Sequence, residues 1–116
     1  MSKILELNNN NFESTIANNT NLVVIDFWAK WCGPCLAFAP VFEQVSLKHP
    51  DCVFAKLDIE AQPQIAQDFN IRSIPFVMIF RGEFIVFAES GSQTAESLNQ
   101  LVMDAKKLSM DDLRKQ

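Results

Sequence analysis

The stretch that decides the fold runs from Leu22 to Cys35 and reads LVVIDFWAKWCGPC. Its first seven residues are apolar on both faces of an extended chain, as in a central strand that is covered on both sides. Its last five, from Trp31 to Cys35, open a helical pattern that continues to about Lys48. Two cysteines three positions apart at a helix start lie on one surface, so their sulfur atoms can meet. The stretch therefore predicts a buried strand leading into a helix that carries a cysteine pair in its first turn.

Strand and helix patterns alternate through the rest of the chain. The alternation implies parallel crossovers, whereas the short link Arg81-Gly82 permits only an antiparallel hairpin. An asparagine-rich break at residues 18–21 ends the first helix. The sequence thus predicts an α/β fold, a central mixed five-stranded sheet flanked by four helices. Strands are expected at about 4–7, 22–29, 52–57, 76–80 and 84–88, and helices at about 12–17, 32–48, 64–69 and from Thr94 onward.

The two long helices each carry one apolar stripe at helical spacing. These stripes supply the core of one domain over residues 1–108, and residues 109–116 are expected to form a short extension, helical or frayed. The expected stripes are Cys35, Phe38, Ala39, Phe42 and Val45 in the first helix and Leu98, Leu101, Val102, Ala105 and Leu108 in the second.

Length and composition bound the class of protein. The 116 residues are 48% hydrophobic and 21% charged, with a net charge of −4, as in an ordinary soluble domain. The only basic clusters are Lys106-Lys107 and Arg114-Lys115, which argues against nucleic-acid binding. No segment has the length of a membrane span, and the N-terminus lacks the uninterrupted apolar core of a signal peptide. We therefore expect a cytoplasmic monomer whose three cysteines are not a structural disulfide framework.

The cysteine pair predicts thiol–disulfide exchange. A thiol attacks a disulfide only as a thiolate, and the free N–H groups at a helix start should lower the pKa of Cys32. Cys35 shares the core stripe and should be less accessible. Cys32 is thus the expected nucleophile, and Cys35 the residue that resolves the mixed disulfide and leaves the pair oxidised. Gly33 and Pro34 keep the turn at the helix entry tight.

Asp26 interrupts the buried strand, where a carboxylate is costly unless it is paired. Burial raises the pKa of a carboxyl group, which would fit Asp26 to exchange a proton with Cys35 near neutral pH. The alternative is a structural aspartate that is hydrogen-bonded to backbone or water. The strand alone leaves these two readings open.

The cysteines also allow a second hypothesis, that they bind a metal ion. Cys32, Cys35, His49 and Cys52 spell C-x2-C-x13-H-x2-C, a Cys3His zinc set. Geometry argues against it, because one helix over residues 32–48 separates the two pairs by roughly 24 Å. His49 is then a residue at the C-terminal end of the helix, and Cys52 a small apolar strand residue, with regulatory oxidation as its alternative role.

These residues resemble the thioredoxin family closely. The similarity includes residues 27–35, with Asp26 and Pro40 at the expected offsets, and continues through Lys56-Leu57-Asp58, residues 71–75 and Gly91. It covers roughly residues 3 to 107. The Trp-Cys-Gly-Pro-Cys sequence in a β-α-β setting is highly specific, unlike a bare C-x-x-C.

The resemblance implies the thioredoxin fold and general protein-disulfide reductase activity, a role in electron transport and cell redox homeostasis. It implies no bound cofactor, with electrons supplied by NADPH through a flavin-containing thioredoxin reductase. The implied clients are ribonucleotide reductase, peroxiredoxins and methionine sulfoxide reductases.

The resemblance also implies a cis peptide bond between Ile74 and Pro75, beside Cys32, where the Ile74 backbone can pair with an extended client. A partner-facing apolar patch would then consist of Trp31, Gly33, Pro34, Ile59, Ile74 and Gly91. From the residues alone, Trp31 and Ile74 can also be read as packing residues.

Three departures from the family pattern lie close to this patch. Leu36 stands where a basic residue is usual, Ser90 replaces an apolar residue before Gly91, and Ser73 occupies a frequent glycine position. They bear on the choice of clients rather than on the chemistry. Two other functions stay open: an oxidant or isomerase on the same fold, which Gly33-Pro34 and the lack of a signal peptide disfavour, and a binding or holdase module that uses the patch without turnover.

Overall fold

The computed structural model describes residues 4–17 and 21–114, and it has the predicted order of strands and helices with one further helix. The break expected at residues 18–21 lies mostly outside the described residues. The strands are β1 (Leu5–Glu6), β2 (Leu22–Trp28), β3 (Val53–Asp58), β4 (Phe76–Arg81) and β5 (Phe84–Ser90). The helices are α1 (Phe12–Ala17), α2 (Gly33–Ser46), α3 (Pro63–Asp68), α4 (Ala95–Lys106) and α5 (Met110–Arg114).

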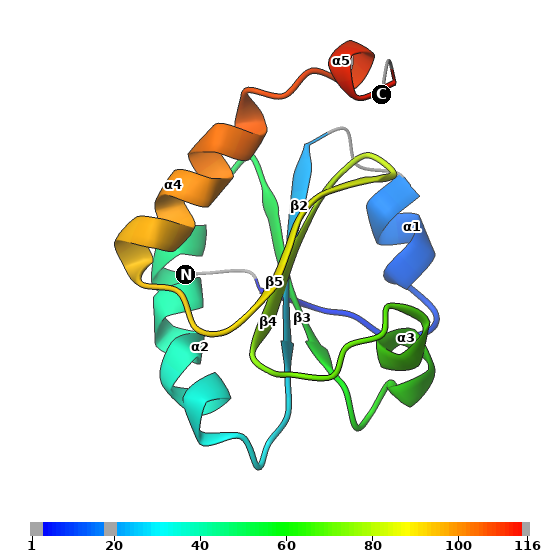
Figure 1. Ribbon diagram of the computed structural model, residues 1–116, viewed down its shortest axis with the longest axis vertical. Coiled ribbons are helices and arrows are strands. Elements are labelled where there is room, and N and C mark those ends of the chain that lie inside the picture. Colours follow the sequence, from blue (N-terminus) through cyan, green and yellow to red (C-terminus); the bar gives the residue numbers. More distant parts are fainter. Residues whose placement is uncertain (1–3, 18–20, 115–116) are drawn as a thin grey trace.

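The five strands form one mixed sheet in the order β1-β3-β2-β4-β5, which confirms the predicted α/β architecture. The pairs β1–β3 and β3–β2 are parallel, and the pairs β2–β4 and β4–β5 are antiparallel. Figure 1 shows α2 and α4 on one side of the sheet and α1 and α3 on the other. Among the described residues, no helix is both long and apolar enough to cross a membrane.

Strand β2 lies in the middle of the sheet and is covered on both faces, as its apolar run predicts. Successive side chains of a strand point to opposite faces. Val23, Ile25 and Phe27 accordingly pack in the cluster that includes α1, and Leu22 and Val24 pack in the cluster that includes α2 and α4. By the same alternation Asp26 faces α2.

Helix α2 begins directly after Cys32, the N-cap residue, and ends at Ser46, two residues before the predicted end. Cys35, Phe38, Phe42 and Val45 are buried on its inner side, as expected. The prediction for Ala39 was wrong, because this residue is exposed. Ala39 lies at the edge of the stripe and borders a cavity rather than the packed core.

Further differences lie at the ends of elements. Cys52 is half-buried and precedes β3 instead of lying in it. The hairpin turn consists of Gly82 and Glu83, since Arg81 still pairs with Phe84. The stripe of α4 ends at Ala105, because Leu108 lies beyond the helix and is 36% exposed. Local pattern does not settle such boundaries.

The fifth helix was not among the four that the sequence predicts to flank the sheet. It belongs to the segment that was expected to be helical or frayed. Leu113 of α5 is buried, and the Met110 side chain lies over Gly82 of the β4–β5 turn. The boundary after residue 108 stays a prediction, and α5 packs back onto the sheet at that turn.

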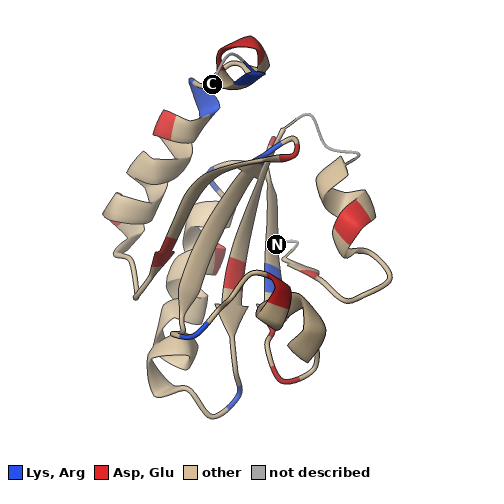
Figure 2. Cartoon of the chain, turned by 45° about the vertical axis from the view of Figure 1, so that its right-hand side comes forward, with Lys and Arg blue, Asp and Glu red and all other residues tan. Residues whose placement is uncertain are grey.

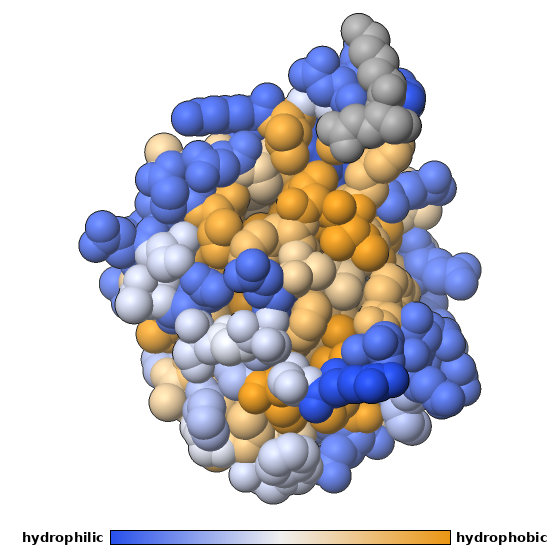
Figure 3. All heavy atoms as spheres, in the orientation of Figure 1, coloured by the Kyte–Doolittle hydropathy of each residue, from blue (hydrophilic) through white to orange (hydrophobic). Residues whose placement is uncertain are grey.

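Strand β5 forms one edge of the sheet, opposite the short edge strand β1. In Figure 3 the face over β5 is largely apolar, and Ile85 is 48% exposed. Glu89 and Ser90 at the end of the strand are exposed polar residues. The strand also has a register irregularity opposite Ile79 and Phe80, a feature that disfavours pairing with another chain.

Two leucines of the predicted α4 stripe provide a test of the packing. Leu98 is fully buried, whereas Leu108 is 36% exposed. Leu98→Ala should lower the free energy of unfolding by about 2–5 kcal/mol, because it removes buried methyl groups and leaves a cavity. Leu108→Ala should cost less than about 1 kcal/mol. Urea unfolding of both variants measures the difference, and equal losses would contradict this packing of α4.

Candidate active site

The cysteine pair lies at the junction of β2 and α2, as the sequence predicts. Cys32 and Cys35 form a disulfide, and their Cα atoms are 5.2 Å apart. Cys32 is the N-cap residue of α2, and its Sγ atom accepts a hydrogen bond from the Cys35 N–H at 3.2 Å. The sulfur of Cys32 therefore sits where the first N–H groups of a helix favour negative charge.

Both cysteines are enclosed by neighbouring side chains. Cys35 is 1% exposed and Cys32 is 4% exposed, so Cys35 is the less accessible residue by a smaller margin than expected. The pair packs with Ala29 and against Trp28, Ile59 and Ile74. These apolar contacts leave little of the disulfide exposed.

A second segment reaches the disulfide from the start of β4. The Ile74–Pro75 peptide bond is cis, as the resemblance implies. The Ile74 carbonyl oxygen lies 3.9 Å from Cys32 Sγ. Gly91, which follows β5, brings a third segment to the cis-proline loop. Its N–H donates a hydrogen bond to the Pro75 carbonyl oxygen at 2.7 Å. Residues 32, 74 and 91 are thus brought to one end of the sheet.

The residues of the expected partner-facing patch differ in exposure. Trp31 is 65% exposed, whereas Trp28 is half-buried and packs against the cysteines. Gly33, Pro34 and Gly91 are exposed, and Ile59 and Ile74 are half-buried. Leu36, which directly follows Cys35, is 54% exposed and adds to the apolar surface. These exposures are compatible with docking of a partner, and the docking role itself stays a prediction.

Asp26 is buried in the sheet and faces α2. Asp26 is only 4% exposed. Its Oδ1 atom has no hydrogen-bond partner among the described residues. A cavity of about 290 Å³ borders it, lined also by Lys56, Glu43 and Ala39. No described backbone or side-chain group holds Oδ1 by a hydrogen bond, so of the structural alternative, backbone or water, only water in the adjoining cavity is compatible with this atom.

Burial is the main cause of the shifted pKa of Asp26. Burial raises the pKa of Asp26 from 3.8 to about 7, and the positive charge of Lys56 lowers it in part. Lys56 lies opposite Asp26 in the parallel register of β2 and β3, and its Nζ atom is 5.2 Å from the centre of the Trp28 ring. Sequence reasoning did not single out Lys56 for this role, because the strand register is needed to bring it opposite Asp26.

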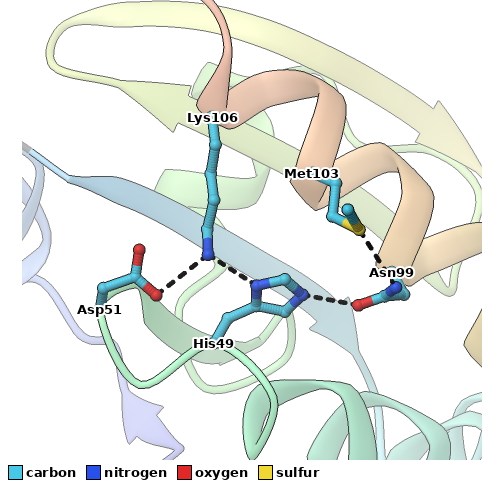
Figure 4. A network of polar contacts seen from close by, with 5 residues as sticks. All are labelled: His49, Asp51, Asn99, Met103 and Lys106. Atoms are coloured by element: carbon cyan, nitrogen blue, oxygen red, sulfur yellow. Dashed lines mark hydrogen bonds and ion pairs between the residues drawn. The ribbon is translucent and has the colours of Figure 1, made fainter.

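His49 has a different role from the one expected. It lies beyond the end of α2, and its ring is buried and contacts α4 (Figure 4). Lys106 Nζ lies 2.8 Å from Nδ1, and because an ammonium group can only donate, Nδ1 accepts and Nε2 carries the proton. Nε2 then donates to Asn99 Oδ1 at 2.6 Å, and Lys106 also pairs with Asp51 at 3.0 Å. This network joins the turn after α2 to α4.

The residues of the alternative Cys3His zinc site make other interactions in the structure. Both ring nitrogens of His49 have hydrogen-bond partners, and Cys32 is bonded to Cys35. Burial raises the pKa of the Cys52 thiol, which disfavours the thiolate that binds metals. Within residues 4–17 and 21–114, no group of three or more His, Cys, Asp or Glu side chains is placed to hold a metal ion.

Comparisons with known proteins agree with this geometry. The family model described as "Thioredoxin" matches residues 3–104. "Putative thioredoxin 2" of Streptomyces coelicolor is 47% identical over 115 residues, which cover 99% of this chain and 85% of that protein. "Thioredoxin C-3" of Corynebacterium nephridii is 44% identical and covers 83% of this chain, which spans 66% of that protein. The crystal structure of Malassezia sympodialis thioredoxin has a TM-score of 0.79 at 30% identity, covering 90% of this chain and 91% of that one.

The raised pKa of Asp26 predicts how stability depends on pH. Between about pH 4 and pH 7 the unfolded chain releases the Asp26 proton while the folded chain keeps it. Stability should therefore fall as the pH rises through this range, by on the order of 4 kcal/mol if the whole shift is expressed. Above pH 7 this contribution is constant. Asp26→Asn should abolish the decline and be the more stable protein at pH 8.

Urea unfolding of the oxidised protein across this pH range measures the effect. Asp104→Asn, which neutralises an exposed carboxylate on α4, is the matched control for a change of net charge. A decline of the same size in Asp26→Asn and in the unmodified protein would show that the buried carboxyl group is not its source.

Proposed function

The chain belongs to the thioredoxin family, and we propose that it is a general reductase of protein disulfides. It is a thiol-disulfide oxidoreductase with a redox-active cysteine pair, and its family membership indicates disulfide reduction. One observation carries the proposal. The sulfur of Cys32 lies at the N-terminus of α2 and 3.9 Å from the backbone of the cis-proline loop, where a client strand can align.

The first step is attack by Cys32. In the reduced protein the Cys32 thiolate attacks one sulfur of the client disulfide, forming a Cys32–client bond and releasing the other client sulfur as a thiolate, which takes a proton from water. The N-terminal N–H groups of α2 stabilise the attacking thiolate. The 3.2 Å contact from the Cys35 N–H supports this assignment. Gly33 and Pro34 hold the helix entry that presents these groups.

The second step is resolution by Cys35. Its thiol loses a proton, and the thiolate attacks Cys32 Sγ, which breaks the mixed disulfide, releases the second client thiolate and forms the Cys32–Cys35 bond. We assign Asp26 as the acceptor of that proton. A pKa of about 7, raised by burial, supports the assignment because such a group exchanges protons near neutral pH. The cavity beside Asp26 is lined in part by two charged residues, Lys56 and Glu43.

Client binding is assigned to the surface around the disulfide. Trp31, Ile59 and Ile74 would provide apolar contacts. Pro75 and Gly91, linked by the 2.7 Å hydrogen bond, would keep the Ile74 backbone available to an extended client segment. The exposed Leu36 side chain enlarges the apolar area and would favour clients whose disulfides are flanked by apolar residues.

Membership of the family supports a proposal for the source of electrons and for the cellular setting. The oxidised pair would be reduced by the dithiol of a flavin-containing thioredoxin reductase that draws on NADPH, and no cofactor need be bound to this chain. Ribonucleotide reductase, peroxiredoxins and methionine sulfoxide reductases are the proposed clients. We propose that the protein acts as a monomeric electron carrier in the cytoplasm and contributes there to cell redox homeostasis.

Insulin reduction tests the function. With NADPH and a thioredoxin reductase, the protein should couple NADPH oxidation to the reduction of insulin disulfides. Cys32→Ser should lower the rate to that of the reaction without protein, because the nucleophile is lost. Cys52→Ser is the matched control, since it removes the half-buried free thiol outside the site and should keep the activity.

A reductant, an oxidant and a holdase give different outcomes in this assay. Turnover with NADPH identifies the reductant. Catalysed oxidation of reduced clients without NADPH turnover would identify the oxidant, and suppression of client aggregation without either would identify a holdase. The last two results would overturn the proposal.

The two cysteine roles predict opposite behaviour in trapping experiments. Cys35→Ser should accumulate Cys32–client mixed disulfides, because the resolving thiol is missing. Cys32→Ser should accumulate none. Non-reducing electrophoresis with mass spectrometry of the adducts provides the measurement. Trapping by Cys32→Ser instead would reverse the assignment of the two cysteines.

A further inference from the structure

A second hollow lies on the other side of the sheet from Asp26. It is bordered by α1, by α3 and by the β4–β5 turn, and its volume is about 520 Å³. Pockets for small ligands typically measure about 300–1,000 Å³. Glu83, which lines the hollow, follows the end of β4, whereas Pro75 of the cysteine site precedes the start of β4. The hollow and the cysteine site therefore lie at different places on the protein.

The floor of the pocket is aromatic. Phe12, Phe69 and Phe80 form a cluster in which each ring contacts the other two, with ring centroids 5.4 to 6.4 Å apart. Phe12 and Phe80 are buried, and Phe69 is half-buried. They come from α1, from the residue after α3 and from β4, so the folded sheet is needed to assemble them. This floor offers apolar area to a ligand.

The rim of the pocket is acidic. Glu13, Asp68 and Glu83 line it, and no Lys, Arg or His of residues 4–17 and 21–114 does. In the described part of the chain none of the three carboxylates has a salt-bridge partner, and Asp68 accepts one hydrogen bond from Gln64. Figure 2 shows acidic positions in red on α1 and at the β4–β5 turn. The rim is therefore a source of uncompensated negative charge above an apolar floor.

We propose that this pocket binds a small organic cation, an ammonium group on an aromatic or alkyl body. The body would pack against the three phenylalanine side chains, and the cation would be attracted by the carboxylates of the rim. An anion would be repelled by the rim. A metal ion fits poorly, because these carboxylates are not among any group of three that could hold one in the described residues. The proposal rests on this pocket alone and does not depend on the reductase activity.

The probe is 3-phenylpropylammonium, and its matched neutral control is 3-phenylpropan-1-ol. Each is titrated into isotope-labelled oxidised protein, and NMR shift changes locate and measure binding. The cation should bind about threefold to tenfold more tightly than the alcohol, as expected for one or two partly exposed ion pairs. The largest shifts should fall on residues of α1, on the end of α3 and on the β4–β5 turn. High salt should remove the advantage of the cation.

Two sets of variants distinguish the effect of the rim carboxylates from the effect of the protein's net charge. Glu13→Gln combined with Glu83→Gln changes two exposed side chains and should abolish the preference for the cation while alcohol binding is retained. Glu96→Gln combined with Asp104→Asn removes the same amount of charge from two exposed carboxylates on α4, at the other face of the sheet, and should preserve the preference. Equal affinity for cation and alcohol, shifts centred elsewhere, binding of neither probe, or equal effects of the two sets of variants would each overturn the proposal.

Discussion

The register between β2 and β4 is the constraint on which the site depends. The two strands are antiparallel, and Phe27 near the end of β2 pairs with Phe76 at the start of β4. The chain that leaves β2 and the chain that enters β4 must therefore meet at one edge of the sheet. The first becomes the N-terminus of α2 with Cys32, and the second is the cis-proline loop. Backbone hydrogen bonds within the sheet thus position both halves of the redox site.

The same central strand carries a destabilising group. Asp26 occupies a position between buried apolar neighbours, where desolvation disfavours the carboxylate, and Lys56 offsets only part of this cost. An apolar residue would suit β2 better if stability alone mattered. The pKa near 7 fits the proton exchange that we propose for Asp26, and a loss of stability at a functional residue is a common trade between stability and activity.

The two faces of the sheet differ chemically. The face under α2 and α4 holds Asp26 and its cavity, and the His49–Lys106 contact joins the turn after α2 to α4. The opposite face, under α1 and α3, ends in the aromatic pocket with its acidic rim. Strand alternation separates the two, because neighbouring residues of β2 and β4 point in opposite directions. The sheet therefore separates the surroundings of Asp26 from the aromatic pocket, and the two cavities share no described lining residue.

Local pattern was sufficient for the order of elements, the buried central strand and the cysteine pair at a helix start, because hydrophobic periodicity and caps act over a few residues. The cis peptide bond was expected only through the family resemblance. The exposure of Ala39, the position of Lys56 beside Asp26 and the contacts of His49 required the fold. These features depend on which distant segment lies opposite, since strand register and helix packing join residues about 30 to 57 positions apart.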